Sequence, residues 1–118
     1  MSVSRILIAE DEILIALFLE DMLTGLGYQV AGVATTVAEG LRHAAAPDFD
    51  LAILDVHLNG EDVFALADTL AGLGLPFVFA TGYGARGVPH RHAGRPVLQK
   101  PYGPEDLHHV LQAVASAN

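Results

Sequence analysis

The sequence predicts an α/β protein, a doubly wound parallel sheet of five strands in the order 2-1-3-4-5, and three observations lead to this fold class. Short apolar runs alternate with segments of helical spacing along the chain. The connections between them are short, and no repeat or low-complexity segment interrupts the alternation. The apolar runs at 6–9 and 51–54 both lead directly into carboxylates. Such alternation is typical of βα units, whose parallel strands end at one edge of the sheet.

Each expected strand is a short segment centred on apolar residues and flanked by turn or cap residues. An unbroken apolar run of this length is typical of a strand that is buried on both faces. We expect strands at 5–10, 28–33, 51–55, 76–80 and 95–99.

Each expected helix carries apolar residues three or four positions apart. We expect helices at 12–26, 37–46 and 61–70, and from about 104 to the C-terminus. Asp11 is able to cap the first helix, and Thr35-Thr36 can cap the second. Pro104 is well placed at the first position of the last helix.

A further long helix is due between the fourth and fifth strands, but the segment 83–94 does not fit one. The segment is rich in Gly and contains Pro89, and its apolar positions match neither a helical nor a strand period. We expect a loop or a short, poorly ordered helix there.

The composition bounds the class of protein. A chain of 118 residues predicts a single domain, and we expect no output domain. The hydrophobic share is 52%, yet no apolar run approaches the ~18–20 residues of a membrane helix, and no signal peptide is evident. Cysteine is absent, which excludes disulfides and thiolate metal sites. Because neither a membrane helix nor a signal peptide is evident, we expect a cytoplasmic protein. A net charge of −8 argues against nucleic-acid binding, so we expect the protein to act through contacts with other proteins.

Polar side chains stand where four of the expected strands end. Glu10 and Asp11 end the first strand and Asp55 ends the third, so three carboxylates are expected to meet at the C-terminal edge of the sheet. Carboxylates this close repel one another unless a cation offsets the charge, and an oxygen-rich site favours Mg²⁺. Thr81 and Lys100 end the fourth and fifth strands at the same edge.

With these residues in place, the chain resembles a receiver domain of the two-component response regulators, which have a flavodoxin-like fold. The resemblance implies that Asp55 is the phosphoacceptor and that Glu10, Asp11, Asp55 and the backbone carbonyl of His57 hold Mg²⁺. It also implies that Thr81 and Lys100 bind the phosphoryl oxygens, and that the Lys100-Pro101 bond is cis. The expected partners are a sensor histidine kinase or a histidine phosphotransfer protein, and a downstream protein target.

The run Phe79-Ala80-Thr81-Gly82 narrows the resemblance. It is similar to the receiver subfamily that is named for a Phe-Ala-Thr-Gly motif. That subfamily is often paired with HWE-type histidine kinases, and its fourth helix tends to be short or disordered.

Three positions depart from the pattern of most receivers. Val97 stands where a Tyr or Phe usually swings inward on activation, and Gly82 replaces a usual Ala. Asn59 stands where a Pro is usual. Because a Val cannot make the aromatic swing, we expect activation to order or reposition the segment 83–94 instead.

Other functions compete with this interpretation. A haloacid dehalogenase-type, Mg²⁺-dependent phosphatase would carry a second Asp where this chain has His57, and an FMN carrier would want a hydroxyl-rich loop after the first strand. A receiver-like docking module that takes no phosphate is a third possibility. Four further histidines, His90, His92, His108 and His109, lack the spacing of a zinc site, and we expect them at the surface.

Overall fold

The computed structural model describes residues 3–116, with the side-chain placement at 84 and 85 excepted. Its main sheet has five parallel strands, and the order across the sheet is β2-β1-β3-β6-β7. The strands are β1 (Arg5–Ala9), β2 (Gln29–Ala34), β3 (Leu51–Asp55), β6 (Phe77–Thr81) and β7 (Val97–Gln99). Numbered among themselves they run 2-1-3-4-5, which confirms the predicted fold class.

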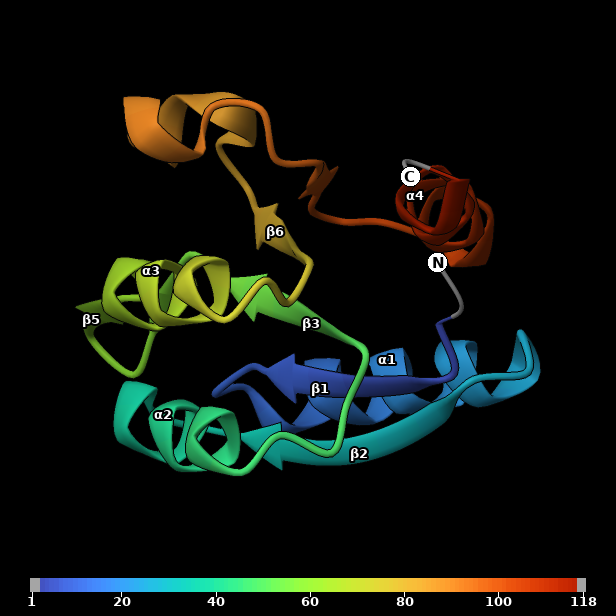
Figure 1. Cartoon of the computed structure of the whole chain (residues 1–118). Helices are drawn as coiled ribbons and strands as arrows, with labels where there is room; N and C mark the ends of the chain where they lie inside the picture. Colours follow the sequence, from blue (N-terminus) through green and yellow to red (C-terminus); the bar gives the residue numbers. More distant parts are fainter. Residues whose placement is uncertain (1–2, 117–118) are drawn as a thin grey trace.

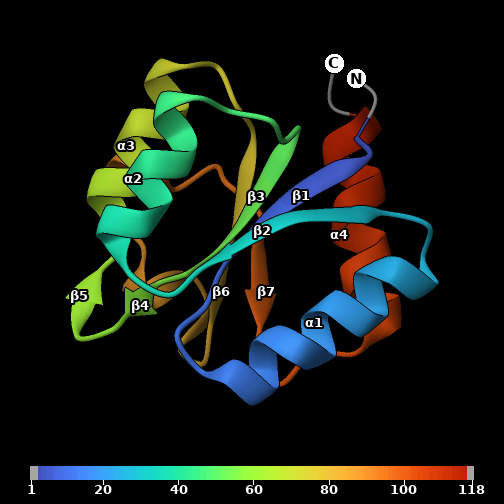
Figure 2. The ribbon, with the colours of Figure 1, turned by 90° about the horizontal axis from the view of Figure 1, so that it is seen from below.

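Four α-helices cover the two faces of the sheet, with α2 and α3 on one face and α1 and α4 on the other (Figure 2). Their bounds are α1 (Ile13–Gly25), α2 (Val37–Ala45), α3 (Phe64–Gly72) and α4 (Pro104–Ser116). Within residues 3–116, no helix combines the length and the hydrophobicity needed to cross a membrane.

The core divides into two layers because successive residues of a strand face opposite sides of the sheet. Leu7, Leu54 and Phe79 pack with α2 and α3 on one side. Ile8 and Ile53 pack with α1 and α4 on the other. Residues 6–9 of β1 and 51–55 of β3 are buried, so close packing on both faces restricts the movement of these strands.

The helix ends agree only in part with the predictions. Thr36 caps α2 by accepting a hydrogen bond from the Glu39 N–H at 3.1 Å, and α4 begins at Pro104 as expected. The capping role of Asp11 is wrong, because Glu12 is the N-cap residue of α1 and no side chain caps that helix. The Asp11 carboxylate lies instead near those of Glu10 and Asp55.

A small hairpin lies where the sequence predicted the start of the third helix. Strands β4 (His57–Leu58) and β5 (Glu61–Asp62) pair antiparallel around a two-residue turn, so α3 begins at Phe64 rather than at 61. Asn59 and Gly60 have φ of 52° and 82°. Both values lie in the left-handed region that Asn-Gly turns of tight hairpins adopt. A proline, whose φ is fixed near −65°, could not replace Asn59 in this turn.

The segment between β6 and β7 forms two 3₁₀ turns, η1 (Gly84–Gly87) and η2 (His90–His92), in place of a long helix. The expectation of a loop or a short helix is therefore confirmed, and its disorder stays a prediction. These turns lie beyond β6 at one end of the molecule (Figure 1).

His92, at the end of η2, corrects the expectation that all four histidines lie at the surface. Its side chain is only 4% exposed and is surrounded by the rings of Phe64, Phe77 and Phe79. Its Nε2 lies 2.7 Å from Oδ1 of Asp68 on α3. A carboxylate gives the buried ring a hydrogen-bond partner, so burial costs less than it would for an unpaired imidazole.

Candidate functional site

The C-terminal edge of the sheet brings the predicted site residues to one place. Glu10 directly follows β1, Asp55 is the last residue of β3, Thr81 is the last residue of β6 and Lys100 directly follows β7. The strands are parallel and adjacent, so their ends share this edge (Figure 1). The Lys100-Pro101 bond is cis, as expected.

Three carboxylates meet at this edge. Glu10, Asp11 and Asp55 each offer one oxygen, and these oxygens lie within 4.8 Å of one another. Glu10 and Asp55 are 3% and 9% exposed, whereas Asp11 is partly exposed. A compact set of carboxylate oxygens with an opening to solvent suits a hard divalent cation such as Mg²⁺, so the residues present fit the predicted metal site.

Lys100 lies between two of these carboxylates. Its Nζ donates to Oε1 of Glu10 and to Oδ2 of Asp55, each at 3.1 Å. Burial works against the charge on this ammonium, but the hydrogen bonds from Lys100 to Asp55 and Glu10 outweigh it and raise the pKa of Lys100. The lysine therefore stays charged and ties the end of β7 to the ends of β1 and β3.

Glu10 has the most perturbed carboxyl group of the site. Burial raises its pKa to about 7 and the neighbouring charge of Asp55 adds to this, whereas the hydrogen bonds from the Glu12 N–H and from Lys100 act in the opposite direction. A strongly perturbed carboxyl beside other titratable groups is typical of functional sites.

Backbone donors fix the orientation of the remaining groups. The His57 N–H donates to Oδ1 of Asp55 at 3.3 Å, so both oxygens of Asp55 have partners. The hydroxyl oxygen of buried Thr81 accepts a hydrogen bond from the Tyr83 N–H at 3.1 Å. The His57 side chain is exposed.

The structure thus brings Glu10, Asp11, Asp55 and Lys100 into one cluster and places Thr81 at the same edge. Sequence reasoning missed Gln99, whose side-chain amide donates to the Gly82 carbonyl at 2.9 Å. It also missed Tyr102, whose pKa burial raises to about 12. The only signal for either residue was its place beside the Lys100-Pro101 pair.

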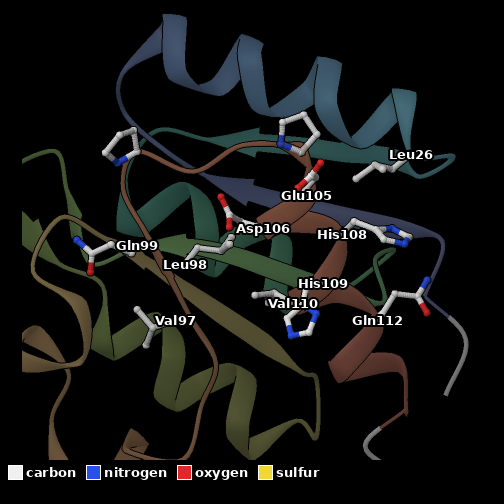
Figure 3. A pocket seen from close by; sticks show the side chains of 12 residues that line it. Leu26, Val97, Leu98, Gln99, Glu105, Asp106, His108, His109, Val110 and Gln112 are labelled. Atoms are coloured by element: carbon white, nitrogen blue, oxygen red, sulfur yellow. The ribbon is translucent and has the colours of Figure 1, made fainter.

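A groove elsewhere on the surface does not take part in this cluster. It runs along β7 and α4, and Val97, Leu98, Glu105, His108 and His109 are among its lining residues (Figure 3). The two histidines are exposed, as predicted. Within residues 3–116 the carboxylates of Glu10, Asp11 and Asp55 form the one group suited to hold a metal ion, so the groove is not the metal site.

Comparison with known proteins decides the family. The family model of the response regulator receiver domain matches residues 6–112. The chain belongs to the response regulator receiver domain family. Receiver domains generally bind Mg²⁺ through an acidic pocket and act through contacts with kinases or phosphotransfer proteins and with downstream targets.

Two curated regulators are similar to this receiver domain. The chain is 33% identical to the phyllosphere-induced regulator PhyR of Methylorubrum extorquens over 112 residues, which are 92% of the chain and 42% of PhyR. It is 34% identical to the transcriptional regulatory protein PdtaR of Mycobacterium tuberculosis over 116 residues, 95% of the chain and 57% of PdtaR. The chain therefore spans about half the length of these relatives.

A solved structure of similar length matches more fully. The solution structure of SdrG from Sphingomonas melonis Fr1 has a TM-score of 0.84 at 43% identity, and the match covers 98% of this chain and 99% of SdrG. The BeF₃-activated conformation of SdrG matches with a TM-score of 0.83 over 97% of this chain and 98% of SdrG. The chain is homologous to these regulators, and phosphorylation with signalling through protein contacts fits it.

Proposed function

We propose that this receiver domain accepts a phosphoryl group on Asp55 in a Mg²⁺-dependent reaction and signals through protein contacts. One observation carries the proposal. Lys100 bridges Glu10 and Asp55 at the mouth of the acidic pocket, so a nucleophilic carboxylate, a cation site and a fixed ammonium stand together.

The chemistry assigns a role to each residue. An oxygen of Asp55 attacks the phosphorus atom, the bond from phosphorus to the donor's imidazole nitrogen breaks, and an acyl phosphate forms on Asp55. Lys100 and the hydroxyl of Thr81 donate hydrogen bonds to the phosphoryl oxygens. Glu10, Asp11, Asp55 and the backbone carbonyl of His57 would hold Mg²⁺, which when bound neutralises charge on the phosphoryl group.

The phosphodonor in this proposal is a sensor histidine kinase, HWE-type by the subfamily resemblance, or a histidine phosphotransfer protein. The similarity to SdrG supports a regulator that is activated by a phosphoryl group, since SdrG has a BeF₃-activated conformation. The protein would work in the cytoplasm and pass its signal to a downstream protein. It would not be an enzyme with a separate substrate, although it would promote its own phosphorylation and dephosphorylation.

The test is phosphorylation by acetyl phosphate with Mg²⁺, followed by intact-mass spectrometry. The wild-type chain is expected to gain one phosphoryl group, and Asp55→Asn none. Asp21→Asn, the same change at an exposed position of α1, is the matched control and should label like the wild type. Removal of Mg²⁺ by EDTA should abolish the labelling.

Two outcomes would favour the other functions. If neither acetyl phosphate nor any kinase in a phosphotransfer panel labels the wild type, the chain is better described as a docking module. If the isolated chain turns over a phosphate ester, the Mg²⁺-dependent phosphatase is favoured instead.

A further inference from the structure

Gln99, at the C-terminal end of β7, forms a polar link between the ends of two neighbouring strands. Its Nε2 donates to the Gly82 carbonyl at 2.9 Å, and a longer contact of 3.4 Å joins it to the Lys100 carbonyl. The side chain is exposed, so it contributes little to the core. Gln99 is among the residues that line the groove beside α4, and in Figure 3 its amide points away from that helix. The main contact of this side chain is therefore its hydrogen bond to the Gly82 carbonyl, and not packing in the core.

The link holds one of the two peptide groups that flank Gly82. An ideal Cβ on Gly82 would meet no other atom within 4 Å, and glycine gives the backbone more freedom than any other residue. The Thr81 carbonyl, one residue earlier, already accepts from the Lys100 N–H at 2.9 Å. With the Gly82 carbonyl bound to Gln99, the two successive peptide planes on either side of Gly82 are both fixed.

The second of these peptide planes carries the donor that orients Thr81. The Tyr83 N–H belongs to the same peptide group as the Gly82 carbonyl, and it donates to Oγ1 of Thr81 at 3.1 Å. A hydroxyl that accepts one hydrogen bond still has its own proton to donate. A fixed Tyr83 N–H therefore restricts the directions in which the Thr81 proton can point.

We propose that Gln99 is a positioning residue for Thr81: by holding the Gly82 carbonyl, it prepares the Thr81 hydroxyl to donate to a phosphoryl group on Asp55. This inference rests on the proposed function, because it concerns the same site. Donors that are oriented before the charge arrives need not reorganise when it does, which is the condition for strong electrostatic stabilisation.

The test measures the affinity of the chain for beryllofluoride with Mg²⁺ by NMR titration. Gln99→Met keeps the length of the side chain but has no donor. We expect it to bind beryllofluoride about 5-fold more weakly, the loss that corresponds to one hydrogen bond of ordinary strength. Gln99→Arg places an N–H at the same distance along the side chain and should restore most of the affinity. Gln112→Met, an exposed position on α4, is the matched control and should bind like the wild type.

A double-mutant cycle separates positioning from a general structural role. Thr81→Val removes the hydroxyl, so Gln99→Met should cause no further loss in that background. The thermal unfolding midpoint of Gln99→Met should equal that of the wild type, because the side chain is exposed.

The inference is overturned if Gln99→Met binds as tightly as the wild type, or if its loss is undiminished in the Thr81→Val background. Loss of affinity in both Gln99→Met and Gln99→Arg would also overturn it. Failure of the wild type itself to bind beryllofluoride would instead contradict the proposed function.

Discussion

Two connections cross the same face of the sheet, and they are held in different ways. Between β3 and β6 the chain forms the β4–β5 hairpin and then α3, which buries the apolar side chains of Leu66, Ala67 and Leu70. Between β6 and β7 it forms η1 and η2, and among the side chains that the structure describes in these turns that of His92 is buried. Buried apolar side chains of α3 hold the first connection in place. The second is held by the buried ring of His92, which has Asp68 as its polar partner.

The second connection also depends on the first. Arg91 binds Asp68 of α3 through two hydrogen bonds of 2.8 and 3.1 Å, and His92 lies 2.7 Å from the same carboxylate. Asp68 is therefore one attachment point for both residues. A short, irregular segment can keep a defined conformation in this way, because a neighbouring helix supplies the partners that its own backbone lacks.

The largest effect is expected from His92→Ala, which removes the enclosed ring of η2. The change leaves a cavity among Phe64, Phe77 and Phe79 and removes the bond to Asp68, so we expect a loss of about 2–3 kcal/mol in unfolding free energy. Urea unfolding measures it. His92→Phe keeps the ring volume and is expected to cost less than about 1.5 kcal/mol. An equal loss in both variants would show that the bond to Asp68, rather than the packing, holds η2.

A smaller loss of unfolding free energy is expected from Gly40→Ala, which disturbs the packing of α2 against α3, the helix of the first connection. An added Cβ would lie 2.4 Å from Cδ2 of Leu66, a fully buried side chain of α3. Overpacking of this kind costs about 1–3 kcal/mol, and the better helix propensity of alanine offsets up to about 1 kcal/mol of it. Gly25→Ala, where an added Cβ meets no other atom within 4 Å, is the control in the same urea assay. A Gly40→Ala variant as stable as the wild type would mean that Leu66 has room to move.

Arg95→Ala tests the C-terminal end of the connection between β6 and β7. The Arg95 guanidinium carbon lies 4.2 Å from the centroid of the Phe77 ring, a cation–π contact worth about 0.5–1 kcal/mol at a partly exposed site. We expect a loss of this size in urea unfolding and a smaller one in Arg95→Lys, which keeps the cation. A loss as large as that of His92→Ala would contradict the assignment of Arg95 to the rim of the aromatic cluster.

The smallest effect is expected from Asp68→Asn, and it depends on pH. The hydrogen bond from Arg91, and to a smaller extent the one from His92, holds the pKa of Asp68 below its ordinary value of 3.8. A carboxyl whose pKa is lower in the folded state adds stability above its unfolded pKa, and this stability is lost as the pH falls through the folded pKa. The wild type should therefore be slightly more stable than Asp68→Asn at pH 6, and the difference should shrink as the pH falls below 3.8 and through the lower pKa of the folded state. A difference that persists at low pH would mean that the charge of Asp68 is not its cause.

The sequence was a good guide where local pattern and topology agree. Apolar runs that end in Asp55 and near Glu10 predict the site, because all parallel strands end at one edge. The stretch 57–60 is turn-like in the sequence, but the hairpin was missed because its strands have only two residues each and the second leads directly into the helical pattern of Val63, Phe64 and Leu66. The buried place of His92 depends on a partner 24 positions away, and no local pattern contains that information.

The left-handed turn at Asn59 and Gly60 has a consequence for protein engineering. Exchanging residues with relatives is a common way to stabilise a domain, and most receivers would suggest proline at 59. The ring of proline excludes the φ of 52° found here, so that single exchange would break the hairpin next to Asp55, the proposed phosphoacceptor. Transplanting the whole stretch 57–62 as a unit would respect the geometry, whereas consensus substitution one position at a time would not.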